Sequence, residues 1–370
     1  MKIVYLTFSI IPCTRADSVQ SMRMCHGLVE AGHDVVLLAP DRPLPEPVAG
    51  DLHAFYGLPA SFEVRKLPWI HVLGRAYVYG IFAAWRCRRL RPDLVYSRTT
   101  WEAMGACWMG LPTVFESHSP VGGRLTTPLF RRFLKSRHLV RLVVISEALR
   151  EYYRATHGFE ASRLVVARDG ADPLPEDLPA PDRWPGRKGP LQVGYFGSLV
   201  EGRGLDLIAR LAAANSALDF HLVGGRPGQV AYWKERMPGP NVFFHGWVSP
   251  RDIPRYLAAC DILLAPYEQR VFIGQGDYET TAWMSPMKLF EYMAAGKAIV
   301  CSDLPVLREF MCPGENALLC PPDDVAAWQA ALLQLSESPG LRARLGERAC
   351  REVAEKYTWK IRAEKVLAGL

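Results

Sequence analysis

The sequence predicts an α/β protein with two doubly wound domains, each built on a parallel sheet with helices on both faces. The chain has 370 residues, which is long enough for about two domains, because a domain typically has ~100–200 residues. Short, continuously apolar runs recur along the chain, as expected for strands that are buried on both faces. Helical patterns separate these runs, which predicts β-α-β crossovers.

We expect six strands in each half of the chain, each an apolar run rich in β-branched and aromatic residues. In the first half they are residues 3–8, 34–39, 94–97, 113–116, 142–145 and 164–167. In the second half they are residues 191–196, 218–223, 242–245, 262–265, 298–302 and 317–320. Helical patterns with start or stop signals lie at 18–30, 146–156, 205–214, 250–259, 286–295 and 325–335.

A proline-rich stretch at 171–190 has no periodic pattern and is typical of a semi-rigid spacer. We therefore expect a first domain at 1–172, a linker at 173–189 and a second domain at 190–356. Residues 357–370 form a further helix that we expect to return to the first domain. Ligands of open parallel sheets bind beyond the carboxyl ends of the strands, so two such domains would face each other across a ligand-binding cleft.

Composition excludes several classes of protein. Hydrophobic residues make up 49% and charged residues 22%, which excludes a disordered or collagenous chain. No apolar run is long enough for a membrane span, and the first residues are typical of a strand, not of a signal peptide. The nine cysteines include no CxxC pair, so we expect reduced thiols in a cytoplasmic protein and no metal site.

The net charge of +6 is unevenly placed, because basic residues greatly outnumber acidic ones between 75 and 141. This imbalance indicates an anionic partner, such as a membrane surface, a phospholipid or a polyanionic glycan. Residues 129–141 combine basic side chains, including Arg131 and Arg132, with apolar ones, and resemble an interfacial helix. The alternative is a solvated basic face. Nucleic acid fits less well, since no recognition module is evident here.

The segment 284–302 combines helix-start signals with charged side chains. Ser285 is expected as the N-cap and Pro286 as the first helical residue. Lys288 then lies in the first turn, where a cation opposes the helix dipole unless an anion binds over that end. Glu291 lies on the same helix face, placed to accept hydrogen bonds from sugar hydroxyls. The alternative is an ordinary surface Lys–Glu pair.

Two further segments follow predicted strands. Gly197, Gly202 and Gly204 open a strand-to-helix loop to close backbone approach, and Arg203 stands just before the helix. The alternative is that this glycine-rich loop is only a tight turn between a strand and a helix. His118 lies two residues past a strand end, as a ligand-facing or a structural histidine. The fingerprint GxGxxG is absent after the first strand, which disfavours NAD or FAD as a cofactor.

Together these segments resemble glycosyltransferase family 4, whose members have a pair of Rossmann-like domains called the GT-B fold. The resemblance follows ordered motifs along nearly the whole chain, at residues 18–35, 197–204, 241–246, 259–262, 291–300 and 357–363. It implies a retaining glycosyltransferase of cell-surface glycan or glycolipid assembly, without a metal. The second domain would hold a nucleotide-sugar donor and the first a glycan or lipid-linked acceptor, with peripheral attachment to the inner face of the cell membrane as a further hypothesis.

The resemblance also implies roles for residues. Arg203 would bind the donor diphosphate, Glu291 the ribose, and His118 would lie beside the transferred sugar. We assign catalytic roles to His118, Arg203 and Lys288. The expected donor-binding residues are Gly197, Ser198, Trp247, Ser285, Pro286, Met287 and Glu291. The expected acceptor-side residues are Ser18, Arg131 and Arg132.

Two departures from the family pattern stand out. Trp283 occupies the position of the first glutamate of the family's E-x7-E motif, and Ser198 replaces its usual arginine. Lys288 is a candidate for the missing charge, and Asp277 or Glu279 for the missing acid. The alternatives are a GT-B-type sugar-nucleotide epimerase, an inactive nucleotide-sugar-binding partner subunit, or a two-lobed binding protein.

Overall fold

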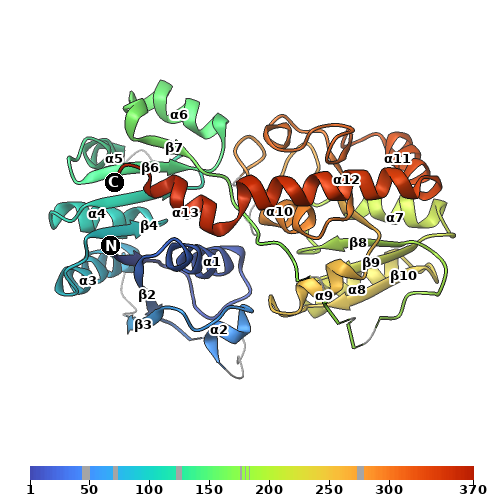
Figure 1. The fold of residues 1–370 in the computed structure, drawn as a ribbon, viewed down its shortest axis with the longest axis horizontal. Coiled ribbons are helices and arrows are strands. Elements are labelled where there is room, and N and C mark those ends of the chain that lie inside the picture. The colour runs from blue at the N-terminus through green and yellow to red at the C-terminus, as the bar shows by residue number, and fades with distance from the viewer. Residues whose placement is uncertain are drawn as a thin grey trace. The chain divides into compact units, whose positions relative to one another are not determined.

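The computed structural model describes eight stretches of the chain, namely residues 1–43, 51–69, 74–121, 127–175, 177–179, 181–182, 184–272 and 279–370. They divide into two compact units, shown in Figure 1. Unit 1 comprises Met1–Asp169, Trp283–Ser285 and Trp359–Leu370. Unit 2 comprises Gly170–Ala282 and Pro286–Thr358.

Unit 1 contains a seven-stranded parallel sheet in the order β3-β2-β1-β4-β5-β6-β7. Its strands are β1 (Lys2–Leu6), β2 (Asp34–Asp41), β3 (Glu63–Pro68), β4 (Leu94–Ser97), β5 (Thr113–Ser117), β6 (Leu139–Val144) and β7 (Leu164–Val166). Its helices are α1 (Ala16–Glu30), α2 (Leu52–Phe55), α3 (Arg75–Arg89), α4 (Thr100–Trp108), α5 (Thr127–Leu134), α6 (Glu147–His157), the 3₁₀ turn η1 (Ala161–Arg163) and α13 (Trp359–Leu367).

Six of these seven strands coincide with the predicted apolar runs, and β3 is the one that the pattern missed. β3 pairs only with β2 and is therefore an edge strand. Only Leu67 of its six residues is buried. Because an edge strand is partly solvated, it lacks the continuous apolar run of a central parallel strand.

Unit 2 contains a six-stranded parallel sheet in the order β10-β9-β8-β11-β12-β13, and all six strands coincide with predicted runs. They are β8 (Gln192–Phe196), β9 (Asp219–Val223), β10 (Val242–Gly246), β11 (Ile262–Ala265), β12 (Ala298–Ser302) and β13 (Leu318–Cys320). The helical segments are α7 (Leu205–Ala214), α8 (Pro227–Arg236), α9 (Ile253–Ala258), α10 (Met287–Ala294), η2 (Leu307–Glu309), α11 (Val325–Glu337), α12 (Pro339–Glu352) and the π-helical turn η3 (Val353–Tyr357). The predicted fold class, two doubly wound parallel sheets, is confirmed.

The last helix, α13, packs on α1 of unit 1, as the sequence predicts for residues 357–370. Gly27 of α1 makes the close approach possible. A Cβ atom at this position would lie 2.5 Å from the carbonyl oxygen of Trp359, so a larger residue would push the two helices apart.

The described part of the proline-rich segment is attached to unit 2. The ring of Trp184 stacks on that of His221 at a centroid distance of 4.0 Å. Arg187 forms an ion pair with the buried carboxylate of Asp219, at an N–O distance of 2.6 Å. Unit 2 begins at Gly170, before the expected linker at 173–189.

Candidate functional site

The strand order of unit 2 places a ligand-binding position at the carboxyl ends of β8 and β11. From β8 the chain first adds β9 and β10 on one side and then β11 to β13 on the other. This reversal leaves the carboxyl ends of β8 and β11 open between diverging loops, which is where ligands of such sheets bind. Gly197 follows β8, and the segment Pro266–Glu268 follows β11.

Lys288 projects into this position from the first turn of α10. Its ammonium nitrogen Nζ lies 4.5 Å from the ring centroid of Tyr195 and 4.9 Å from that of Tyr267. A Cβ on Gly197 would come within 3.3 Å of Nζ, so the absence of a side chain there leaves room for the lysine. Burial, and then the nearby charge of Arg203, hold the pKa of Lys288 well below its usual range.

Arg203 contributes a second cation to the same position. Its guanidinium carbon lies 5.6 Å from the ring centroid of Tyr267, and its Nε is buried without a hydrogen-bond partner among the described residues. Within that part of the chain, neither Arg203 nor Lys288 forms an ion pair. Two neighbouring, partly desolvated cations repel each other, and a bound anion would relieve this cost for both.

The glycine-rich loop that carries Arg203 is held by Glu268, a residue that the sequence analysis did not assign. One carboxylate oxygen of Glu268 accepts hydrogen bonds from the backbone N–H groups of Gly202 and Gly204, both at 3.1 Å. Gly204 has a φ of +69°, and a Cβ there would lie 1.9 Å from the carbonyl oxygen of Pro266. Arg203 thus stands between two fixed amides. The sequence signal that could have identified Glu268 is its position just after a predicted buried strand, at 262–265.

The start of α10 differs from the prediction by one residue. Pro286 is the N-cap and Met287 the first helical residue, so the expected N-cap role of Ser285 is wrong. The hydroxyl oxygen of Ser285 instead accepts a hydrogen bond from the backbone N–H of Asp169 in unit 1, at 2.9 Å.

The other expected donor-binding residues lie around the same sheet edge. Ser198 is exposed, and its carbonyl oxygen accepts a hydrogen bond from the hydroxyl of Tyr195. Glu291 lies one turn after Lys288, and its charge favours the protonated lysine. Trp247 directly follows β10, with 48% of its surface exposed.

Of the two candidates for the missing acid, the structure describes only Glu279. Trp283 belongs to unit 1, where its ring lies 6.2 Å from that of Tyr152 and packs against the core. Glu279 forms an ion pair with Arg270 at 2.9 Å. Asp277 lies outside the described residues.

The expected acceptor-side residues of unit 1 lie in different surroundings. Ser18 is fully buried, and its hydroxyl hydrogen-bonds the hydroxyl of Tyr56. Arg131 and Arg132 are exposed on α5.

The predicted interfacial helix over 129–141 is wrong in extent and in its apolar face. The helix ends at Leu134, and β6 begins at Leu139. Phe130, Phe133 and Leu134 of α5 belong to the core of unit 1, whereas Leu129 is 45% exposed. The hydrophobic pattern of the helix reflects this burial, not an exposed apolar face.

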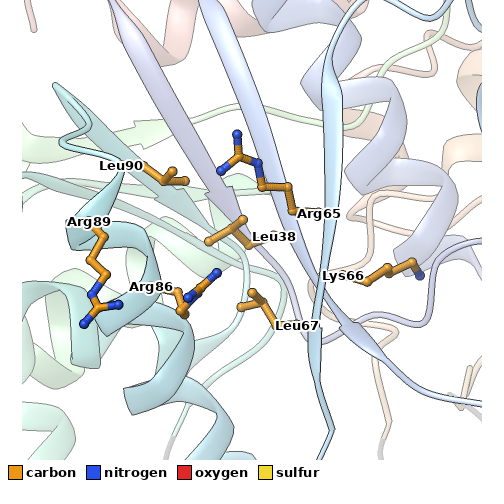
Figure 2. Close-up of a pocket in the computed structure, with 7 residues that line it drawn as sticks. All are labelled: Leu38, Arg65, Lys66, Leu67, Arg86, Arg89 and Leu90. Atoms are coloured by element: carbon orange, nitrogen blue, oxygen red, sulfur yellow. The ribbon is translucent and has the colours of Figure 1, made fainter.

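An exposed apolar face lies on α3 instead. Tyr77, Val78, Ile81 and Trp85 each expose at least 40% of their surface. The last turn of the same helix carries Arg86, Arg88 and Arg89. Beside it, between α3 and the edge strand β3, lies a cavity of about 440 Å³ (Figure 2). Its lining consists of basic residues and leucines: Leu38, Arg65, Lys66, Leu67, Arg86, Arg89 and Leu90.

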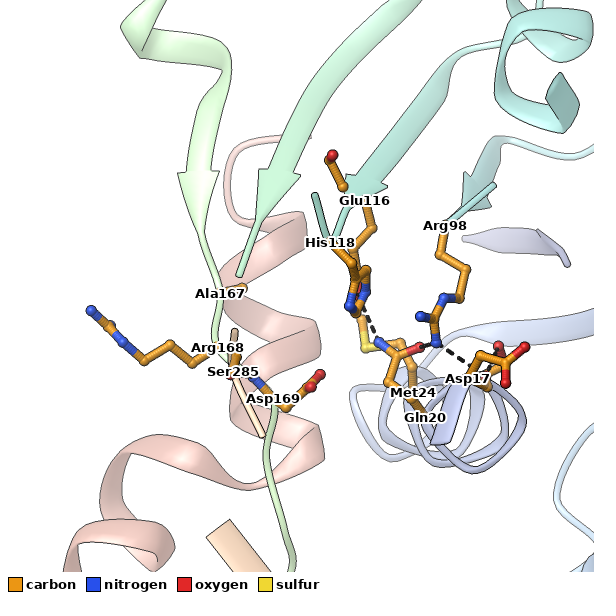
Figure 3. A network of polar contacts seen from close by, with 12 residues as sticks. Asp17, Gln20, Met24, Arg98, Glu116, His118, Ala167, Arg168, Asp169 and Ser285 are labelled. Atoms are coloured by element: carbon orange, nitrogen blue, oxygen red, sulfur yellow. Dashed lines mark hydrogen bonds and ion pairs between the residues drawn. The ribbon is translucent and has the colours of Figure 1, made fainter. Parts of the chain in front are cut away.

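The second polar cluster lies in unit 1, where β5 ends (Figure 3). Glu116 is fully buried on β5, and one of its oxygens lies 2.6 Å from Nε2 of His118. Gln20 of α1 donates a hydrogen bond to the same oxygen, at 2.6 Å, and the hydroxyl of Tyr96 donates one to the other. Burial alone would raise the pKa of Glu116, but the charge of Arg362 and the hydrogen bond with His118 hold it well below its usual value.

Two more charged residues line the same cluster. Arg98, at the end of β4, donates a hydrogen bond to the side-chain oxygen of Gln20 at 2.9 Å. Asp169 follows β7, is 5% exposed, and has one carboxylate oxygen without a hydrogen-bond partner among the described residues. Burial raises the pKa of Asp169. His118 therefore stands among acceptors and cations that suit a ligand rich in hydroxyl groups.

Comparison with known proteins gives matches in both halves of the chain. Residues 18–173 match the family model described as Glycosyltransferase Family 4, and residues 190–338 match the model described as Glycosyl transferases group 1. Phosphatidyl-myo-inositol mannosyltransferase of Mycolicibacterium smegmatis is 25% identical over 94% of this chain and 87% of its own length.

Two further proteins are similar to the chain. TuaH of Bacillus subtilis, named as a teichuronic acid biosynthesis glycosyltransferase, is 26% identical, but the match spans 53% of this chain and only half of the relative. The crystal structure of HepE from Anabaena in complex with UDP and glucose superimposes with a TM-score of 0.72 over the full length of both chains. At 17% identity this last similarity shows a shared fold.

Proposed function

The chain belongs to the glycosyltransferases of group 1 and family 4, and we propose that it moves a sugar from a nucleotide-sugar donor to a hydroxyl acceptor with retention of configuration. One observation carries the proposal most directly. Lys288 and Arg203 form a pair of cations without an ion-pair partner among the described residues, at the carboxyl ends of β8 and β11. A donor pyrophosphate supplies the anion that this pair lacks.

The proposed chemistry follows from where charge develops. The bond between the anomeric carbon and the donor phosphate oxygen breaks, and negative charge builds on the departing phosphate. Fixed cations at that point stabilise the transition state more than the ground state. A new bond forms between the acceptor oxygen and the same carbon, on the face that the phosphate leaves. The acceptor proton passes to the departing phosphate oxygen.

Other residues have supporting roles in this proposal. Glu268 holds the loop of Arg203 through two amide hydrogen bonds. His118, with its side chain 23% exposed, contacts the transferred sugar. Glu291 and Trp247 contact the nucleoside. Because Lys288 and Arg203 supply positive charge at the phosphates, we expect no requirement for a metal.

Binding of a nucleotide sugar tests the proposal first. We expect one of UDP-, GDP-, ADP- or dTDP-sugars to raise the melting temperature, because a ligand of the native state stabilises it by mass action. At a concentration ~100 times the dissociation constant, the gain is about 2.7 kcal/mol. The free sugars are the matched control, since they lack the pyrophosphate. A protein that no nucleotide sugar stabilises contradicts the proposal.

Product analysis then separates transfer from its alternatives. A transferase needs the acceptor, whereas a sugar-nucleotide epimerase converts the donor alone. The position of Trp283 in place of a glutamate favours, as a second candidate, a nucleotide-sugar-binding subunit without activity. That subunit would bind the donor but yield no product with any acceptor.

We further propose that the acceptor belongs to cell-surface glycan or glycolipid assembly and that α3 docks on an anionic membrane. The names of the mannosyltransferase and of TuaH support the first part. The exposed apolar residues and the arginines of α3 support the second, because an apolar stripe beside basic residues is typical of interfacial helices. In the described part of the chain, no helix has the length and apolarity needed to cross a bilayer.

Sedimentation with vesicles tests the membrane proposal. We expect the protein to pellet with phosphatidylglycerol vesicles at low salt and to be released as the salt concentration rises. The double variant Ile81→Glu and Trp85→Glu is expected to abolish pelleting. Leu333→Glu is the matched control, because Leu333 is 57% exposed on α11 of unit 2. Equal pelleting of both variants would remove α3 from this role.

A further inference from the structure

We propose that Arg362 of the last helix is a positioning residue that orients His118 through the buried carboxylate of Glu116. This inference rests on the proposed function, in which His118 contacts the transferred sugar. It assigns a role in the reaction to Arg362, which acts on His118 through Glu116.

The first step is the contact between Arg362 and Glu116. The two side chains are 3% and 0% exposed. Nη1 and Nη2 of Arg362 lie 3.0 and 2.9 Å from the two carboxylate oxygens, so the pair is bidentate. This planar fork fixes the rotation of the carboxylate as well as its position.

The second step fixes Arg362 itself. Its Nε donates a hydrogen bond to the carbonyl oxygen of Arg168 at 2.8 Å, and Nη2 donates one to that of Ala167 at 3.2 Å. Both carbonyls follow β7. The guanidinium is therefore held to the sheet from one side while it holds Glu116 on the other.

The third step runs from Glu116 to His118. An ionised carboxylate only accepts hydrogen bonds, so the imidazole nitrogen 2.6 Å away, Nε2, must carry the proton. In the neutral ring, Nδ1 is then left as an acceptor for a hydroxyl group. Glu116 thus selects both the tautomer and the orientation of the ring, and Arg362 keeps Glu116 ionised and in place.

The neighbouring groups support this arrangement. Gln20 and Tyr96 donate to the same carboxylate, and Arg98 holds Gln20. None of these neighbours replaces the charge of Arg362, because Gln20 and Tyr96 are neutral and Arg98 bonds to Gln20 rather than to Glu116. Without Arg362, Glu116 would be a buried carboxylate that lacks its closest cation.

The experiment compares two arginines that hold the same helix. Arg362→Met removes the contact with Glu116. Arg141→Met is the matched control, because Arg141 is 8% exposed and bonds the carbonyl oxygens of Val366 and Ala368 without touching Glu116. Nitrogen-15 NMR of the imidazoles reports the tautomer of His118, with its signals assigned by their loss in His118→Gln. Transfer assays give kcat and KM for the donor.

In the wild type and in Arg141→Met, we expect the Nε2–H tautomer and similar kcat values. In Arg362→Met, we expect a mixture of tautomers and a fall in kcat of about tenfold or more, with KM for the donor little changed. Arg362→Lys keeps the charge but not the bidentate fork and is expected to recover part of the loss.

Four results would overturn or separate the claims. A folded Arg362→Met protein with the wild-type tautomer and kcat overturns the proposal, as does an equal loss in Arg141→Met. If Arg362→Met does not fold, Arg362→Lys decides, and an unchanged tautomer and kcat in that variant overturns the proposal as well. Full transfer activity in His118→Gln would instead contradict the proposed function of His118, while the NMR comparison still tests the link to Arg362.

Discussion

We expect Lys288→Ala to lower the rate of sugar transfer by about 10²-fold or more, because it removes a fixed cation from the departing phosphate. Lys288 has no ion-pair partner in the described chain, so its loss breaks no structural ion pair. Arg203→Ala is expected to have a similar effect for the same reason. Initial rates with radiolabelled nucleotide sugar measure both.

The control for this experiment is a lysine of the same unit that lies away from the site. Lys234 is exposed on α8, and Lys234→Ala is expected to transfer sugar at the wild-type rate. Thermal melting of all three variants checks that the fold is kept. Turnover near the wild-type rate in Lys288→Ala or Arg203→Ala would remove that residue from the proposed role at the phosphates.

Glu116→Gln is expected to lower the free energy of unfolding of unit 1 by about 3 kcal/mol or more, because it leaves Arg362 as an uncompensated buried charge. Hydrogen exchange of the core amides of unit 1 measures this free energy. Glu63→Gln is the control, since Glu63 and Arg65 form an exposed ion pair on β3. Exposed pairs of this kind contribute at most about 1 kcal/mol.

The penalty of Glu116→Gln depends on pH in a defined direction. The pKa of Glu116 in the folded protein lies well below its ordinary value of 4.5. The stabilisation by the ionised carboxylate is therefore complete above pH 4.5 and is lost as the pH falls toward the folded-state pKa. We expect the difference between wild type and variant to shrink over this range, and a constant difference would contradict the charge-based explanation.

Local patterns of apolar residues in the sequence were enough to predict most of the fold. Of the thirteen strands in the described residues, twelve follow from apolar runs, because a strand in a parallel sheet is mostly buried and its sequence shows this locally. The exception, β3, is half-solvated at a sheet edge. The local positions of two site candidates were also predictable, because helix-start signals place Lys288 in the first turn of a helix and glycine spacing places Arg203 in a strand-to-helix loop.

Contacts between residues that are far apart in the chain could not be predicted from local sequence patterns. Glu268 follows β11 and holds a loop more than 60 residues earlier in the chain, at Gly202 and Gly204. The apolar residues of α5 suggested a membrane surface, but the fold buries Phe130, Phe133 and Leu134 and exposes apolar residues of α3. Periodicity shows that a helix has an apolar face but not what covers that face.

By itself, the sequence determined that this protein has two parallel-sheet domains and a cationic segment at the carboxyl ends of the second sheet, because these properties depend on residues that are near one another in the chain. Only the tertiary structure decided which cations stay unpaired and which are neutralised. Arg362 and Glu116 are 246 positions apart, and their pairing follows from the packing of α13 onto α1. The balance of charge at each site is thus set by contacts that no local pattern records.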